Sequence, residues 1–128
     1  MDKPKILIVD DEEALLMALR RLFNGPKFEV DTSDSLSSAK ICLDQKVYNI
    51  VMTDLRLGDP TNRDGLDVIA YTKHRSPETR IILWTAYGSP SIEERALESG
   101  ANYYFEKPIS PKRIGEIIES ELRAFPPR

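Results

Sequence analysis

Short apolar segments alternate with amphipathic segments along the whole chain. Continuously apolar runs are typical of strands covered on both faces, and apolar residues spaced three or four apart are typical of helices. The pattern predicts strands over residues 5–9, 28–31, 49–53, 80–84 and 102–105. It predicts helices over about 12–24, about 36–43, from 64 to a point before 77, over 90–100, and over 111–123. Residues 28–31 alternate in polarity, which indicates an edge strand.

Capping residues support several of these helix boundaries. Ser89-Pro90 and Ser110-Pro111 each combine an N-cap side chain with a proline at the first helical position. Gly100 is a typical C-terminal stop, and Asp64 can cap the third helix. Pro126 and Pro127 follow the last helix, which they cannot continue.

Five strand–helix units in succession predict an α/β protein with a doubly wound, five-stranded parallel sheet and five helices on its two faces. We expect one domain over residues 1–124, with 125–128 as a tail or the start of a linker. Sheets of this kind bind ligands at the carboxyl ends of their strands.

Composition narrows the class of protein further. The chain has 128 residues, a net charge of −3 and a single cysteine, Cys42, so an internal disulfide is excluded. The acidic balance argues against direct nucleic-acid binding. No apolar run approaches the roughly 20 residues of a membrane span. The N-terminus becomes acidic too early for a signal peptide. We therefore expect a cytoplasmic protein without membrane contact.

Polar, chemically able residues follow four of the five predicted strands. They are Asp10 and Asp11, then Asp54, Thr85 and Lys107. One acid after a strand usually caps a helix or lies in a turn. Three carboxylates at adjacent strand ends would instead repel one another and raise their pKa values, and a divalent cation removes that conflict. Oxygen ligands of this kind suit Mg²⁺.

Two other kinds of site fit the sequence less well. A nucleotide- or flavin-binding module would have a Gly- or Ser/Thr-rich loop after a strand, whereas the first loop here is acidic. A phosphatase with an aspartyl nucleophile would have a second Asp two residues later, where this chain has Arg56. A site that accepts a phosphoryl group on one Asp remains.

Over nearly its whole length the chain resembles the receiver domain of two-component response regulators. The matching segments are ILIVDDEEAL, IVMTDLRLGD, DGLDVI, IILWTAYGS and YYFEKPIS, in the expected order. The resemblance implies a flavodoxin-like receiver fold with strand order 2-1-3-4-5. It also implies that Asp54 is the phosphoacceptor, with a phosphohistidine of a sensor kinase or phosphotransfer protein as donor.

The resemblance also implies roles for the other residues. Mg²⁺, or Mn²⁺, would be held by Asp11 directly, by Asp10 through water, by Asp54, and by the backbone carbonyl of Arg56. Thr85 and Lys107 would bind the phosphoryl group, with Lys107 pairing with Asp54 before phosphorylation. Tyr104 would be the switch residue that follows Thr85, and Pro108 would be preceded by a cis peptide bond.

The implied function is a phosphorylation-dependent switch, with slow self-catalysed dephosphorylation but no enzymatic turnover. The output surface would be the fourth helix, fifth strand and fifth helix, which would control a partner or a following effector domain, or form a homodimer. A constitutive docking domain is the second hypothesis, although it would not require the intact acidic set. A hydrolase acting through phospho-Asp54 is the third, disfavoured by Arg56.

One segment departs from the family pattern. The loop over residues 56–64 is about three residues longer than the usual connection to the third helix. Arg56 and Tyr87, two residues after Asp54 and Thr85, should border the path of a water that attacks the phosphoryl group. Because both are large, we expect a comparatively long-lived phosphorylated form.

Overall fold

The computed structural model describes residues 3–59 and 61–126, which form a parallel sheet of five strands with helices on both faces. The strands are β1 (Lys5–Val9), β2 (Glu29–Ser33), β3 (Ile50–Asp54), β4 (Arg80–Thr85) and β5 (Tyr103–Glu106). The helices are α1 (Glu13–Phe23), α2 (Leu36–Gln45), α3 (Asp64–Arg75), α4 (Pro90–Ser99) and α5 (Pro111–Ala124). The strand order is β2-β1-β3-β4-β5, so the expected doubly wound topology is confirmed.

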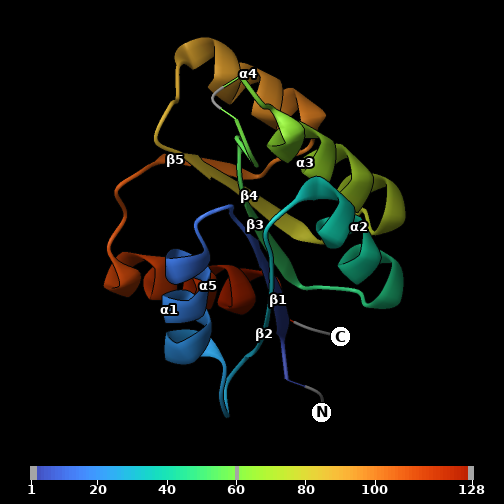
Figure 1. Ribbon diagram of the computed structural model, residues 1–128. Helices are drawn as coiled ribbons and strands as arrows, with labels where there is room; N and C mark the ends of the chain where they lie inside the picture. Colours follow the sequence, from blue (N-terminus) through green and yellow to red (C-terminus); the bar gives the residue numbers. More distant parts are fainter. Residues whose placement is uncertain (1–2, 60, 127–128) are drawn as a thin grey trace.

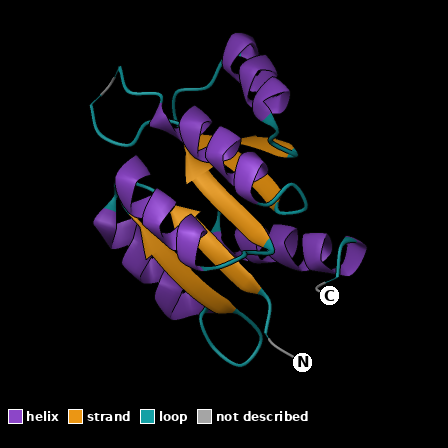
Figure 2. Cartoon of the chain, turned by 90° about the vertical axis from the view of Figure 1, so that its right-hand side faces the viewer, coloured by secondary structure: helices purple, strands orange, loops and turns teal. Residues whose placement is uncertain are grey.

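The helices form a layer on each side of the sheet. Helices α1 and α5 cover one face and α2, α3 and α4 the other, as Figures 1 and 2 show. Alternate residues of β1 serve the two layers: Ile6 and Ile8 pack with α1 and α5, and Leu7 and Val9 with α2 and α3. Within the described residues, no helix combines the length and the apolar character needed to cross a bilayer.

The edge strand β2 is less buried than β1, as its alternating sequence predicts. It begins one residue later and ends two residues later than the predicted 28–31, because the parallel register with β1 runs from Lys5–Glu29 to Val9–Ser33. Lys46, at the end of α2, spans two acids of this strand, with its Nζ 3.0 Å from Glu29 Oε2 and 2.9 Å from Asp31 Oδ2. This cation therefore links the end of α2 to the edge strand β2.

The predicted caps of the last two helices are confirmed. Ser89 Oγ accepts a hydrogen bond from the Ile92 N–H, and Ser110 Oγ accepts one from the Arg113 N–H. Gly100 ends α4 in the left-handed conformation, with a φ of 118° that favours glycine.

The predicted cap of α3 is wrong. Asp64 is the first residue of the helix, and Arg63 occupies the N-cap position without a side-chain hydrogen bond. The side chain of Asn62 takes over the capping contact, since its Oδ1 accepts from the Asp64 N–H at 2.7 Å. The long loop before α3 therefore supplies its own cap.

Like β2, the strands β3 and β5 begin one residue later than predicted, and these two share a reason. The residue before each strand is an asparagine whose side-chain Oδ1 accepts a hydrogen bond from the backbone of a neighbouring strand. Asn49 accepts from the Lys5 N–H of β1 and Asn102 from the Ile81 N–H of β4, both at 2.8 Å. At its other end β3 continues one residue beyond the prediction, so Asp54 is its last residue and pairs in register with Trp84 of β4.

Candidate functional site

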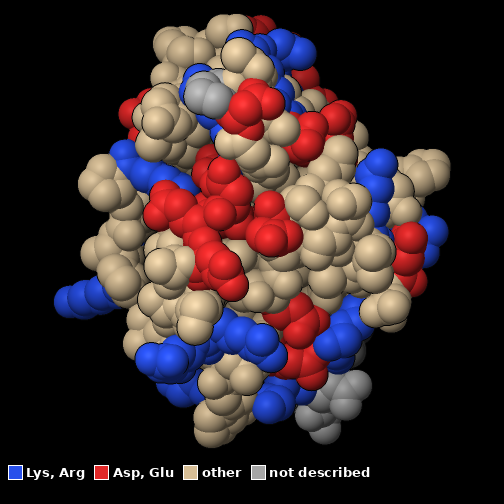
Figure 3. Space-filling view, in the orientation of Figure 1, with Lys and Arg blue, Asp and Glu red and all other residues tan. Residues whose placement is uncertain are grey.

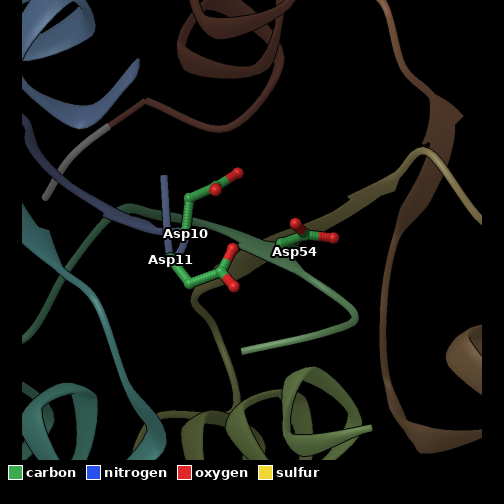
Figure 4. A group of neighbouring side chains, drawn as sticks. All are labelled: Asp10, Asp11 and Asp54. Carbon is green, nitrogen blue, oxygen red and sulfur yellow. The ribbon is translucent and has the colours of Figure 1, made fainter. Parts of the chain in front are cut away.

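The carboxyl ends of β1 and β3 bring Asp10, Asp11 and Asp54 together. One carboxylate oxygen from each residue lies within 4.8 Å of the others. Asp10 is fully buried, Asp54 is 8% exposed and Asp11 is exposed. Figure 4 shows the three side chains at neighbouring strand ends, with those of Asp10 and Asp11 turned in different directions. The parallel topology thus assembles the predicted carboxylate group, because β1 and β3 are adjacent in the sheet.

Lys107, in the loop that follows β5, reaches into this group. Its Nζ lies 2.7 Å from Asp10 Oδ2 and 3.2 Å from Asp54 Oδ2. The sequence suggested the contact with Asp54, but not the shorter contact with Asp10. The ammonium also lies 4.7 Å from the centre of the Trp84 ring, and the Lys107–Pro108 peptide bond is cis.

Burial and charge shift the pKa values of this pair. Burial raises the pKa of Asp54; the charge of Lys107 opposes that shift and the charge of Asp10 adds to it, so the net direction is upward. Burial alone would lower the pKa of Lys107, but the hydrogen bond and charge of Asp10, together with Asp54, raise it overall. Lys107 is therefore positively charged, and it faces the carboxylates of both Asp10 and Asp54.

The donor set fits a divalent cation. Among the described residues, Asp54 Oδ1 is buried and has no hydrogen-bond partner. Asp10 Oδ1, in contrast, accepts the Glu12 N–H at 2.9 Å. Figure 3 shows acidic side chains gathered in the middle of the face that contains this site. Hard oxygen ligands with excess negative charge are what Mg²⁺ and similar cations prefer, so these three residues could hold one.

Thr85 connects the loops around the carboxylates. It is the last residue of β4 and is fully buried. Its Oγ1 accepts the Tyr87 N–H at 3.1 Å, and its carbonyl accepts the Lys107 N–H at 2.9 Å. Thr85 thus lies one residue beyond the Asp54–Trp84 pair and touches the backbone on both sides of the site.

Arg56 and Tyr87 meet across the site. The Arg56 guanidinium lies 4.0 Å from the centre of the Tyr87 ring, in a cation–π contact, and the ring is 61% exposed. The loop after β3 and the loop after β4 are therefore linked at the surface through these two side chains. The sequence placed both residues near the phosphoryl path without indicating that they stack.

Tyr104 lies against the loop between β4 and α4. Its hydroxyl is 3.4 Å from Glu106 Oε1, and its ring packs beside the cluster that includes Ile92 and Ala96. A Cβ placed on Gly88 would overlap the Tyr104 hydroxyl. The absence of a side chain at position 88 therefore lets this tyrosine occupy its place.

Gly65 has a similar role beneath Asp54. A Cβ there would overlap the Asp54 carbonyl oxygen, and the Gly65 N–H donates to the Leu55 carbonyl at 2.9 Å. Sequence reasoning singled out neither Gly65 nor Gly88 as a contact residue. The sequence signal that could have indicated these contacts is that Gly65 follows Asp64 and Gly88 follows Tyr87.

Comparison with known proteins places this arrangement in a family. The model of the response regulator receiver domain matches residues 6–119. The chain therefore belongs to the receiver domain family of two-component response regulators.

Among its relatives is the response regulator protein PilR of Pseudomonas aeruginosa, 32% identical over 123 residues, which cover 96% of this chain and 27% of PilR. Another is the photosynthetic apparatus regulatory protein RegA of Rhodobacter capsulatus, 30% identical over 122 residues, which cover 95% of this chain and 65% of RegA. The chain thus spans about a quarter of the length of PilR and about two thirds of that of RegA.

Solved structures agree with this assignment. A CheY-like receiver domain from Methanospirillum hungatei JF-1 superposes with a TM-score of 0.88 at 24% identity, covering 96% of both chains, and this confirms the receiver fold. The beryllofluoride-activated NtrC4 receiver domain dimer superposes with a TM-score of 0.81 at 26% identity, covering 94% of this chain and 98% of that one.

Replacing Asp54 by Asn should stabilise the metal-free protein at neutral pH. The raised pKa means that the native state holds the Asp54 proton more tightly than the unfolded state does. Stability therefore falls as pH rises from the ordinary Asp value through the raised one. We expect a gain of about 0.5–2 kcal/mol in the free energy of unfolding at pH 7, which disappears below about pH 4. Urea unfolding with EDTA measures it, and a gain that persists at low pH would contradict this cause.

Gly88→Ala should displace Tyr104. Because the new methyl group and the tyrosine hydroxyl claim the same space, we expect a loss of about 1 kcal/mol in unfolding free energy relative to Gly25→Ala. Gly25 is the matched control, since a Cβ there meets nothing within 4 Å. In a Tyr104→Ala background the loss should vanish, as a double-mutant cycle by urea unfolding would show. An equal loss in both backgrounds would contradict the contact.

Proposed function

We propose that this chain is a phosphorylation-controlled switch whose phosphoacceptor is Asp54. The observation that carries the proposal is the free, buried Oδ1 of Asp54, next to the ammonium of Lys107 and one strand away from Thr85. A carboxylate beside a fixed ammonium can take up a phosphoryl group, because the ammonium neutralises the charge that the group brings. Membership of the receiver family supports the same role.

The reaction would be an in-line transfer. One carboxylate oxygen of Asp54 forms a bond to phosphorus while the bond from phosphorus to the histidine nitrogen of the donor breaks. Lys107 can follow the incoming negative charge, because it already lies 3.2 Å from the other Asp54 oxygen. A bound Mg²⁺ or Mn²⁺ would supply the second positive centre for the phosphoryl oxygens. Asp11, Asp54 and the Arg56 carbonyl would hold it, and Asp10 would act through water.

The signal would pass through Thr85 and Tyr104. The Thr85 hydroxyl, which now accepts the Tyr87 N–H, can donate its own hydrogen to a phosphoryl oxygen. Drawing Thr85 toward Asp54 would move the loop that holds Gly88, and Tyr104 packs directly on that loop. The proposed output surface is accordingly α4, β5 and α5.

The partners follow from the family. A sensor histidine kinase or phosphotransfer protein would supply the phosphoryl group. The beryllofluoride-activated NtrC4 receiver is a dimer, which supports a homodimer here. The surface that we propose for it is α4, β5 and α5. PilR is much longer than this chain, which supports control of an effector domain or a separate partner. We expect the domain itself to contact neither nucleic acid nor membrane, and we propose a cytoplasmic location for it.

A turnover enzyme is the less favoured alternative. Arg56 stacks on Tyr87 at the position where an aspartyl phosphatase would carry its general acid. The proposal therefore limits the chemistry to self-catalysed phosphoryl acceptance and slow loss. A constitutive docking domain would need neither the free Asp54 oxygen nor the shared lysine.

Acetyl phosphate with Mg²⁺ should add one phosphoryl group to the protein, because Asp54 lies beside the Lys107 ammonium and the site can bind the cation. Intact-mass spectrometry measures the product. Asp59→Asn removes an exposed acid from the neighbouring loop and should be labelled like wild type. Labelling should disappear with EDTA and in Asp54→Asn. Equal labelling of Asp54→Asn would overturn the proposal.

Removing Arg56 or Tyr87 should shorten the life of the phosphorylated form. Their stack is worth about 0.5–1 kcal/mol and covers the approach of water, so its loss should speed hydrolysis about twofold to fivefold. The half-life of the phosphorylated protein is compared for wild type, Arg56→Ala, Tyr87→Ala and the double variant. Arg123→Ala, an exposed arginine in α5, serves as the charge-matched control. An unchanged or longer half-life in the double variant would contradict obstruction.

A further inference from the structure

The long loop between β3 and α3 is held by buried leucines and by one asparagine. Leu55 and Leu57 are 1% and 6% exposed, so they anchor the loop on both sides of Arg56. Arg56 itself is only partly buried and directs its guanidinium to Tyr87. The loop backbone next to Asp54 is therefore fixed by contacts of its own.

Asn62 connects this backbone to the first residue of α3. Its Oδ1 accepts the Leu57 N–H at 3.2 Å and the Asp64 N–H at 2.7 Å. Its Nδ2 donates to the Leu57 carbonyl at 3.4 Å and to Asp64 Oδ2 at 3.1 Å. One side chain thus holds both polar groups of Leu57 against the start of the helix.

The contact with the Leu57 N–H also determines how the Arg56 carbonyl is oriented. These two groups belong to one planar peptide unit, in which N–H and C=O point in opposite directions when the bond is trans. The cis bond among the described residues is Lys107–Pro108, so the Arg56–Leu57 bond is trans. An acceptor that fixes the N–H therefore fixes the direction of the carbonyl oxygen.

We propose that Asn62 is a positioning residue of the metal site, which sets the orientation of the Arg56 carbonyl toward the bound cation. The proposal deepens the function above, and it rests on the Arg56 carbonyl being a ligand there. Residues that orient ligands from behind commonly change metal affinity by about 10- to 100-fold. The longer loop thus carries its own device for presenting a ligand.

A second polar contact in the same loop provides a matched control. Thr61 donates from its N–H and its hydroxyl to Asp59 Oδ1, at 2.9 and 2.6 Å. This contact orders the loop but does not involve the Arg56–Leu57 peptide unit. Thr61→Val removes the hydroxyl at nearly constant volume and leaves Asn62 in place.

The test compares Mg²⁺ binding by calorimetric titration in wild type, Asn62→Ala and Thr61→Val. We expect about tenfold weaker binding in Asn62→Ala, and an affinity within about twofold of wild type in Thr61→Val. A metal-free readout accompanies it: amide hydrogen exchange of Leu57 should accelerate in Asn62→Ala alone. Asn62→Gln, with the same amide on a longer chain, should also bind Mg²⁺ more weakly and serves if Asn62→Ala does not fold.

The possible outcomes distinguish the positioning role of Asn62 from the existence of the metal site. Wild-type affinity in Asn62→Ala, with fast exchange at Leu57, would overturn the positioning role while the metal site stands. An equal loss in Thr61→Val would overturn it as well, because general loop order would then explain the effect. Failure of the wild type to bind Mg²⁺ would overturn the proposed metal site and this inference together.

Discussion

The ammonium of Lys107 lies between two buried carboxylates that come from different strands, and the arrangement of the site depends on it. Asp10 and Asp54 approach each other because β1 and β3 are neighbours, and Lys107 reaches them from the loop after β5. Asp11 and Glu12 lie close by as well, so the acids at this edge outnumber the ammonium. The sheet therefore holds a deficit of positive charge at its carboxyl edge, which a metal ion can reduce.

Neighbouring loops are connected so that a change at this edge can travel outward. Thr85 touches the backbone of both Tyr87 and Lys107. Tyr87 carries the Arg56 side chain on its ring, which joins the loops after β3 and β4. Packing of Tyr104 on Gly88 extends the connection to β5. A displacement of Thr85 toward Asp54 would therefore act on three loops together.

Much of this arrangement could be predicted from the sequence, because it depends on local patterns. The apolar run at Ile6–Val9 indicated a doubly covered strand, and parallel strands place Asp10, Asp11 and Asp54 at one edge. The Ser-Pro caps were equally local signals.

The remaining details depend on contacts between distant segments. Lys107 contacts both carboxylates, and side-chain geometry makes the contact with Asp10 the shorter one. Pairing with the neighbouring strand β1 sets the length of β2. The capping contact that the sequence assigned to Asp64 is made by Asn62, a residue of the longer loop.

The charged bridge of Lys46 over Glu29 and Asp31 has a consequence of its own. An edge strand that carries charged side chains is a poorer template for an added strand than an apolar one, so this bridge disfavours strand addition along β2.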